Sequence, residues 1–192
     1  GIKHVVRTAQ LRNIALRLAL VLGATASLNS VMPVVAKESL NVGSSGFGVL
    51  AGALGVGSVL AVWLLPILRK KMKAELLAVA ASFVWAAAAV GFAQSSTLLT
   101  AVPALLLCGA TLMVLMNVLF STFIALLPDH LRGRGSSIGM LMAWLGTSVG
   151  AFAWGFTAAS TSVRVALIAS AAVTAGIGVL NRVVLPLGAE TN

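Results

Sequence analysis

Long apolar runs, separated by short polar or charged gaps, dominate this chain. A transmembrane helix needs about 20 predominantly apolar residues. Six runs reach 18 residues or more: 18–36, 47–68, 76–93, 98–127, 137–158 and 165–185. They do not alternate between polar and apolar positions, as the strands of a membrane barrel would. The pattern therefore predicts an all-α membrane protein with six transmembrane helices.

The composition supports this prediction and excludes the soluble classes. Of the 192 residues, 59% are hydrophobic and 9% are charged, and the mean hydropathy is +1.06. A soluble domain is about one quarter charged. Because six spans with short turns use nearly the whole length, we expect no separate soluble domain.

The charged residues lie mostly in the gaps between the apolar runs. The chain has 13 Lys and Arg against 4 Asp and Glu, a formal net charge of +9. Lys37 and Arg164 fall on one side of the predicted bundle, and the other eleven basic residues fall on the opposite side: Lys3, Arg7, Arg12, Arg17, Arg69, Lys70, Lys71, Lys73, Arg132, Arg134 and Arg182. By the positive-inside rule, both termini are then cytoplasmic, and the basic residues set topology and contact lipid headgroups. No basic face or aromatic platform for nucleic acid is evident, so we expect no nucleic-acid partner.

The spans differ in polarity. The third and sixth are bland, whereas the first and fourth contain polar clusters: Thr25, Ser27, Asn29 and Ser30 in the first, and Asn117, Ser121 and Thr122 in the fourth. Polar groups in hydrocarbon are costly unless they face protein or water. We therefore expect the first and fourth spans to face an interior and the third and sixth to face lipid.

Two short segments recur along the chain. GAT at residues 23–25 recurs at 109–111, and GVLAGALG at 48–55 recurs as GMLMAWLG at 139–146. A repeat of three spans places its two copies in the membrane with opposite orientation. Such a 3+3 inverted repeat is typical of secondary transporters.

Asn29 and Asn117 are candidates for a substrate cavity. Pro33 follows Asn29 by four positions and has no N–H for the Asn29 carbonyl, so a free carbonyl and an amide side chain occur together. Thr25 shares the helix face of Asn29, and Ser121 shares that of Asn117, because each pair is four residues apart. These side chains either line a cavity or hold helices together by hydrogen bonds, and the sequence leaves both interpretations open.

Small residues at helical spacing predict close helix packing. Gly48 with Gly52, and Gly146 with Gly150, form GxxxG pairs, in which the missing side chains let two backbones approach. Pro33 inside the first span predicts a hinge or kink.

The sequence shows no enzymatic machinery. GSSG at residues 43–46 resembles the serine motif of rhomboid proteases, but His4 and His130 fall on the opposite, cytoplasmic side, so no histidine base reaches that serine. No metal-ligand cluster, Walker loop or paired carboxylate is present. The acids are expected in loops or in the tail: Glu38, Glu75, Asp129 and Glu190. We expect no enzyme activity, no cofactor and no metal, and any proton-coupling carboxylate lies outside these residues.

Two segments resemble the major facilitator superfamily. The loop and helix that join spans ten and eleven of that family are similar to LLPDHLRGRGSSIGMLMAWLGTSVGAFAWG at residues 126–155, and spans seven and eight are similar to residues 17–72. The matching positions in the first segment are Pro128, Arg132, Gly133, Arg134, Gly139, Gly146, Gly150 and Gly155. More narrowly, both segments resemble the branch that includes the enterobactin exporters and the transmembrane secretion effectors.

The resemblance implies a domain organisation. The family has twelve spans in two six-helix halves, and this chain resembles the second half. Residues 1–17 are then the end of a cytoplasmic linker, residues 18–185 the half-transporter domain, and residues 186–192 a cytoplasmic tail. The cavity-lining seventh and tenth spans correspond to the first and fourth spans here. Arg132 and Arg134 belong to a cytoplasmic gate or contact headgroups, whereas the basic segment 69–75 lacks the family's loop aspartate and is assigned a topological role only.

The expected function is secondary active transport, with efflux of small organic molecules by alternating access across a bacterial inner membrane. The expected partners are a small-molecule substrate, membrane lipids, and the missing N-terminal half or a second copy of the chain. The alternative hypothesis is a complete six-span scaffold or assembly subunit without transport activity.

Overall fold

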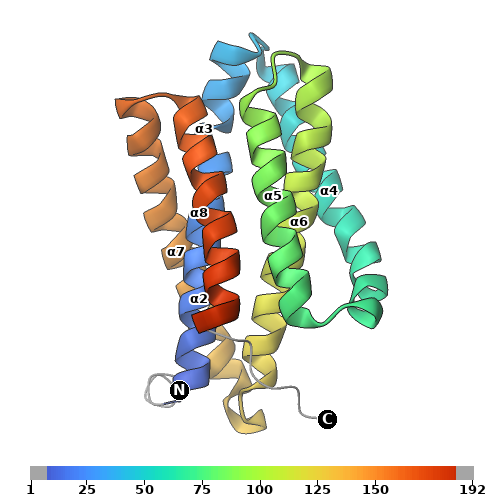
Figure 1. Cartoon of the computed structure of the whole chain (residues 1–192), viewed down its shortest axis with the longest axis vertical. Helices are drawn as coiled ribbons and strands as arrows, with labels where there is room; N and C mark the ends of the chain where they lie inside the picture. The colour runs from blue at the N-terminus through green and yellow to red at the C-terminus, as the bar shows by residue number, and fades with distance from the viewer. Residues whose placement is uncertain (1–7, 185–192) are drawn as a thin grey trace.

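The computed structural model describes residues 8–184, and the side chains of residues 8–180, as a bundle of helices (Figure 1). Within that part of the chain, six helical segments are long and apolar enough to cross a membrane, which confirms the predicted fold class. The first segment joins α2 (Ala9–Thr25), α3 (Ser27–Val34) and the π-helix η1 (Val35–Ser39). The others are α4 (Ser44–Lys71), α5 (Ala74–Ala93), α6 (Leu98–Ala125), α7 (Arg132–Ser160), preceded by the short 3-10 turn η2 (Asp129–Leu131), and α8 (Val163–Val184). The predicted tail, residues 186–192, lies outside the described residues.

The first helix begins earlier than the apolar run does. Residues 9–17, expected in a linker, are helical because Leu11, Ile14 and Leu18 follow a helical spacing and bury their side chains in the core. Arg17 is buried with them, at 1% exposed. Of the linker expected at 1–17, residues 1–7 lie outside the described residues, and residues 9–17 belong to α2.

A bidentate ion pair explains how Arg17 is tolerated inside the bundle. Its Nη1 donates to Glu75 Oε2 at 3.0 Å, and its Nη2 donates to Glu75 Oε1 at 2.7 Å. The planar guanidinium matches the carboxylate in this arrangement, and each charge compensates the other. Glu75 was expected in a loop, but it lies in the first turn of α5, so the pair ties α2 to the start of that helix.

The first span is not one regular helix. Its α2 and α3 segments are separated at Ala26, whose N–H reaches the Gly23 carbonyl at 3.4 Å. Pro33 lies inside α3, and η1 follows, with the Leu40 N–H donating to the Val35 carbonyl five residues earlier at 3.0 Å. Because Pro33 has no N–H, the helix changes its hydrogen-bond spacing in the turn that follows.

The helices form two layers with a helix at each edge. In the view of Figure 1, α8 and α5 lie in front of α2 and α6, with α7 at one edge and α4 at the other. The α2 helix packs on α7, α4 packs on α6, and α5 packs on both α6 and α8. The pairing is the same in both repeats, since each first span packs against the middle span of the other repeat.

Exposure corrects the expected orientation of the spans. The least buried are α4 and α7, rather than α5 and α8. This follows from their edge positions, where each packs mainly on one neighbour. The hydroxyl side chains of Ser82 in α5 and of Ser170 and Thr174 in α8 are buried between helices. Each of these two spans therefore combines a core face with an outer face.

Glycines mark the close crossing of α4 and α6. A Cβ atom on Gly57 would overlap the carbonyl oxygen of Leu106, and one on Gly109 would overlap that of Leu54. Both backbones therefore approach as closely as the absence of side chains permits.

A second crossing of the same kind joins α2 and α7. A Cβ on Gly150 would overlap the Gly23 carbonyl oxygen, and one on Gly146 would overlap that of Ala19. Gly23 and Gly109 are the glycines of the two GAT segments, so both copies of this motif lie at a crossing with the middle span of the other repeat.

Candidate functional site

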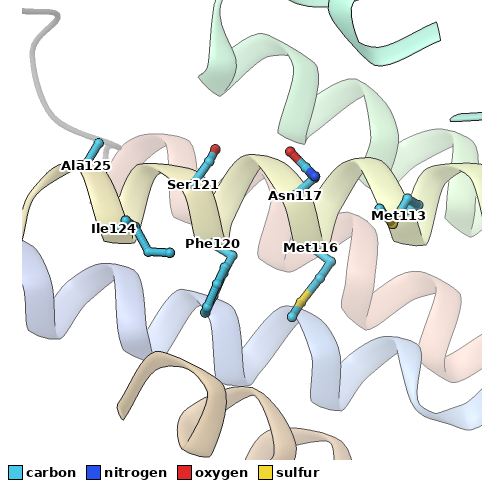
Figure 2. Close-up of a pocket in the computed structure, with 7 residues that line it drawn as sticks. All are labelled: Met113, Met116, Asn117, Phe120, Ser121, Ile124 and Ala125. Carbon is cyan, nitrogen blue, oxygen red and sulfur yellow. The ribbon is translucent and has the colours of Figure 1, made fainter. Parts of the chain in front are cut away.

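A groove runs along one face of α6, near the end of that helix. Its volume is about 380 Å³, within the range of small-molecule sites. Seven residues of α6 line it: Met113, Met116, Asn117, Phe120, Ser121, Ile124 and Ala125. Figure 2 shows Asn117 and Ser121 along one edge of this face and Met116 and Phe120 along the other. The groove thus combines two polar side chains with an apolar lining.

Arg69, near the end of α4, binds the polar side of this groove. Its Nη2 donates to Ser121 Oγ at 2.8 Å, to Asn117 Oδ1 at 3.1 Å and to the Asn117 carbonyl at 3.3 Å. The spacing of Asn117 and Ser121 indicated a shared face from the sequence, but it gave no sign that Arg69 reaches them. In the sequence, Arg69 is one of several basic residues at the end of the second span, and nothing in that run distinguishes it from the others.

Thr25 does not reach this groove or any other surface. It is 2% exposed, and its hydroxyl donates to the carbonyls of Val21 and Leu22 in its own helix. Thr111 of the second GAT segment does the same, with its hydroxyl 2.7 Å from the Leu107 carbonyl. A buried hydroxyl that bonds its own backbone satisfies itself, so the expectation that Thr25 lines a cavity does not fit its position.

Asn29 is exposed on α3, but the structure does not bring it to the α6 groove. Asn29 lies 20 residues after Ala9 and Asn117 lies 19 residues after Leu98, each about 30 Å along its own span. Successive spans run in opposite directions, so the first and fourth are antiparallel and the two asparagines lie toward opposite ends of the bundle. They do not form one local site.

The predicted packing glycines separate into two groups. Gly146 and Gly150 lie at the α2–α7 crossing, where the α2 backbone fills the space above them. Gly48 and Gly52 have no heavy atom within 4 Å of an added Cβ, so their face of α4 is open. The close approach of α4 instead uses Gly57, five residues beyond Gly52 and on the face that meets α6.

The two arginines expected in a loop lie in the first turn of α7 and are exposed. Arg132 Nη2 lies 3.0 Å from Asp129 Oδ1, and the two side chains are 54% and 89% exposed. Arg134 is exposed as well. Neither arginine lines the groove, and their gate or headgroup role stays a prediction.

Comparison with known proteins identifies the family. The model of the transmembrane secretion effector family matches residues 1–192. The chain belongs to this family. Its members form a branch of the major facilitator superfamily of membrane transporters, so this transmembrane secretion effector chain is a multi-pass membrane protein of a transporter family and not of an enzyme family.

A solved structure shows the same fold. The family member is similar to the crystal structure of a variant of the E. coli fucose:proton symporter FucP, with a TM-score of 0.72 and 18% sequence identity. The likeness covers 98% of this chain and 45% of the symporter, so the chain matches about half of a major facilitator fold. A search of the curated proteins finds no match.

Proposed function

We propose that the chain is the C-terminal six-helix half of a transporter that exports small organic molecules by alternating access. The membrane is the bacterial inner membrane, and both termini are cytoplasmic. Support comes from the family, from the match to 45% of the symporter chain, and from the excess of basic residues in the sequence gaps assigned to one side of the membrane.

The α6 groove is the observation that carries the proposal. A groove with Asn117 and Ser121 beside methionine and phenylalanine side chains suits an organic molecule with a polar group. It is lined from α6 alone, so a second surface is needed to enclose a substrate. Asn29 is exposed toward the other end of the bundle, so we assign it to a later part of the path that the substrate follows across the membrane.

The edge helices support a partner for this half. Large apolar side chains stand outward from both edges, with Trp63 of α4 80% exposed and Phe152 of α7 78% exposed. Lipid tails can pack against such apolar side chains, and so can the helices of a second six-helix unit. We propose that the missing N-terminal half, or a second copy of the chain, completes the cavity opposite α6.

Transport by the complete gene product in proteoliposomes tests the proposal. We expect flux that depends on a pH gradient for members of a panel of small organic compounds. Replacing Asn117 by leucine is expected to lower flux and substrate affinity, because the groove loses its polar group. Asn29→Leu is expected to lower flux with a smaller effect on affinity for substrate added from the groove side.

The matched control is Thr122→Val, which changes a polar side chain of the same helix whose hydroxyl bonds the Val118 carbonyl and does not line the groove. It is expected to leave flux unchanged. Unchanged flux in both asparagine variants contradicts the cavity assignment. Absence of gradient-dependent flux for the whole panel contradicts transport itself and favours a scaffold role.

A further inference from the structure

Arg69 is held differently from the basic residues around it. It belongs to the run Arg69, Lys70, Lys71 and Lys73 at the end of α4. Its guanidinium is fixed on α6 by Ser121 and Asn117, at 2.8 and 3.1 Å. A topological signal needs only a charge near the membrane surface. The fixed position of Arg69 beside a groove therefore calls for a further explanation.

The guanidinium lies well inside the end of α6. Asn117 precedes Ala125, the last residue of that helix, by eight positions, which is about 12 Å at 1.5 Å per residue. The neighbouring lining of the groove is apolar, including Met113, Met116 and Phe120. Arg69 itself is exposed, so its cation is not enclosed within the bundle.

Neutral groups supply all the partners of Arg69 in the described part of the chain. The three acceptors share one nitrogen, Nη2, and neither Nη1 nor Nε makes a hydrogen bond there. The amide nitrogen of Asn117 likewise has no acceptor among the described residues. Glu75 is engaged by Arg17, and Asp129 pairs with Arg132. Because Arg69 is exposed, its remaining N–H groups are open to a ligand, and no carboxylate among the described residues is paired with it.

An oxyanion satisfies these conditions. A guanidinium presents its N–H groups in a planar fork that matches two oxygens of a carboxylate or phosphate. With Nη2 fixed on α6, Nη1 and Nε remain for this contact, and the Asn117 amide adds a donor at the groove wall. The apolar side chains of the groove suit the organic part of the same molecule.

We propose that Arg69, positioned by Asn117 and Ser121, is the recognition site for an oxyanion group on the transported molecule, so that the substrate class is organic acids with an apolar body. The inference rests on the proposed transport function. Anionic lipid headgroups present the same oxyanion chemistry, and the experiment must separate the two sources.

Binding to the complete gene product in nanodiscs of neutral phosphatidylcholine separates charge from shape. The probes are 2-naphthoate, its uncharged analogue 2-naphthamide, and phenyl phosphate, each titrated with thermal unfolding as the readout. We expect both anions to bind and stabilise the protein, and we expect the affinity for the amide to be at least tenfold lower. Replacement by glutamine (Arg69→Gln) is expected to weaken anion binding about 10- to 100-fold and to leave amide binding unchanged. Arg69→Lys, which keeps the charge and loses the fork, is expected to restore only part of the affinity.

The control is Lys70→Gln, which removes a neighbouring charge without touching the groove and is expected to leave binding unchanged. Equal losses in Arg69→Gln and Lys70→Gln mean a general charge effect and overturn the proposal. Nanodiscs that contain phosphatidylglycerol distinguish the second source: if the lipid gives Arg69-dependent stabilisation and the soluble anions do not compete with it, the site holds a headgroup, and the substrate assignment is overturned.

Transport measurements separate failure of this inference from failure of the proposed function. If the protein transports neutral or cationic compounds, binds no organic acid, and keeps its flux in Arg69→Gln, transport stands and the anion site is wrong. If no compound in either charge class is transported, the proposed function itself fails.

Discussion

At the α2–α7 crossing, the Gly23 carbonyl accepts a hydrogen bond from Trp154 Nε1 at 2.9 Å. At the α4–α6 crossing, the Gly109 carbonyl accepts one from Ser58 Oγ at 3.1 Å. Both acceptors are GAT glycines, and both donors lie on the middle span of the other repeat. The two crossings are therefore two versions of the same arrangement, in which a side chain of one helix binds the bare backbone of the other.

The helices that carry the acceptors differ. The first span is interrupted at Ala26, three residues after Gly23, whereas α6 continues without a break from Leu98 to Ala125. At the interruption the Gly23 carbonyl has a long bond of 3.4 Å from the Ala26 N–H, so Trp154 is its better donor. Gly109 lies within a regular helix, where Ser58 is an additional donor. The comparison shows that the broken span depends on its neighbours for bonds that the continuous span makes by itself.

An arginine also ties each of these two spans to a neighbouring helix near one end, and the two contacts differ in their charge compensation. Arg17 of α2 is buried and paired with a carboxylate, whereas Arg69 binds α6 through neutral groups and is exposed. The irregular span is fixed by a compensated charge, and the regular span has an uncompensated charge beside an open groove.

The largest effect is expected from breaking the buried ion pair. Glu75→Gln removes the carboxylate charge that the buried Arg17 guanidinium binds, and we expect the free energy of unfolding to fall by about 3 kcal/mol or more. Chemical unfolding in detergent micelles measures the change.

The controls are the exposed charges of the same bundle. Asp129→Asn breaks a pair whose side chains are 54% and 89% exposed, and Arg69→Gln removes a charge held by neutral groups. Each is expected to change stability by less than about 1 kcal/mol. A Glu75→Gln variant as stable as these controls would show that the two arginine contacts are equivalent.

The next effect compares the two crossings directly. Gly57→Ala pushes a methyl group into the Leu106 backbone, and we expect it to cost about 1–3 kcal/mol of unfolding free energy. Gly150→Ala is expected to cost less, although its clash is as close, because the α2 backbone can shift at Ala26. Gly52→Ala, on the open face of α4, is the control and is expected to be neutral or slightly stabilising. Equal losses at the two crossings would show that the break gives no relief.

The arrangement into six spans was predictable because a bilayer imposes its requirement locally. Each run had to supply enough consecutive apolar residues, and that is visible in the sequence without knowing any neighbour. The irregularity around Pro33 was predictable for the same reason, since a missing N–H affects its own turn. The interruption at Ala26 was not, because no proline marks it and the donor that binds the nearby Gly23 carbonyl, Trp154, is 131 positions from Gly23 in the sequence.

The contacts between helices were predictable only in part. GxxxG spacing in α4 showed that small residues share a face, but Gly48 and Gly52 point away from α6 while Gly57 meets it. Spacing specifies a helix face, and only packing specifies what that face meets. Arg69 was hidden similarly, because its link to α6 requires the ends of two helices that are separate in the sequence to lie side by side.

A smaller effect is expected from the hydrogen bond at the broken span. Trp154→Phe keeps an aromatic ring at the crossing and removes the Nε1–H that binds the Gly23 carbonyl. We expect a loss of about 1 kcal/mol in unfolding free energy, measured by thermal or chemical unfolding in micelles. Trp144→Phe, on the same helix and 65% exposed, is the control and is expected to have no measurable effect. Equal effects of the two substitutions would mean that the bond to Gly23 adds nothing.

The smallest effect is expected from the corresponding bond at the continuous span. Ser58→Ala removes the donor to Gly109, but that carbonyl belongs to an uninterrupted helix, and Ser58 Oγ is also 3.0 Å from the Leu54 carbonyl of its own helix. The hydroxyl is shared and its loss leaves no backbone group unsatisfied, so we expect a change below about 0.5 kcal/mol by the same unfolding measurement. The double variant with Trp154→Phe is expected to be additive, because the crossings are separate. A loss in Ser58→Ala as large as in Trp154→Phe would show that the carbonyl bond matters whether or not the helix that carries it is broken.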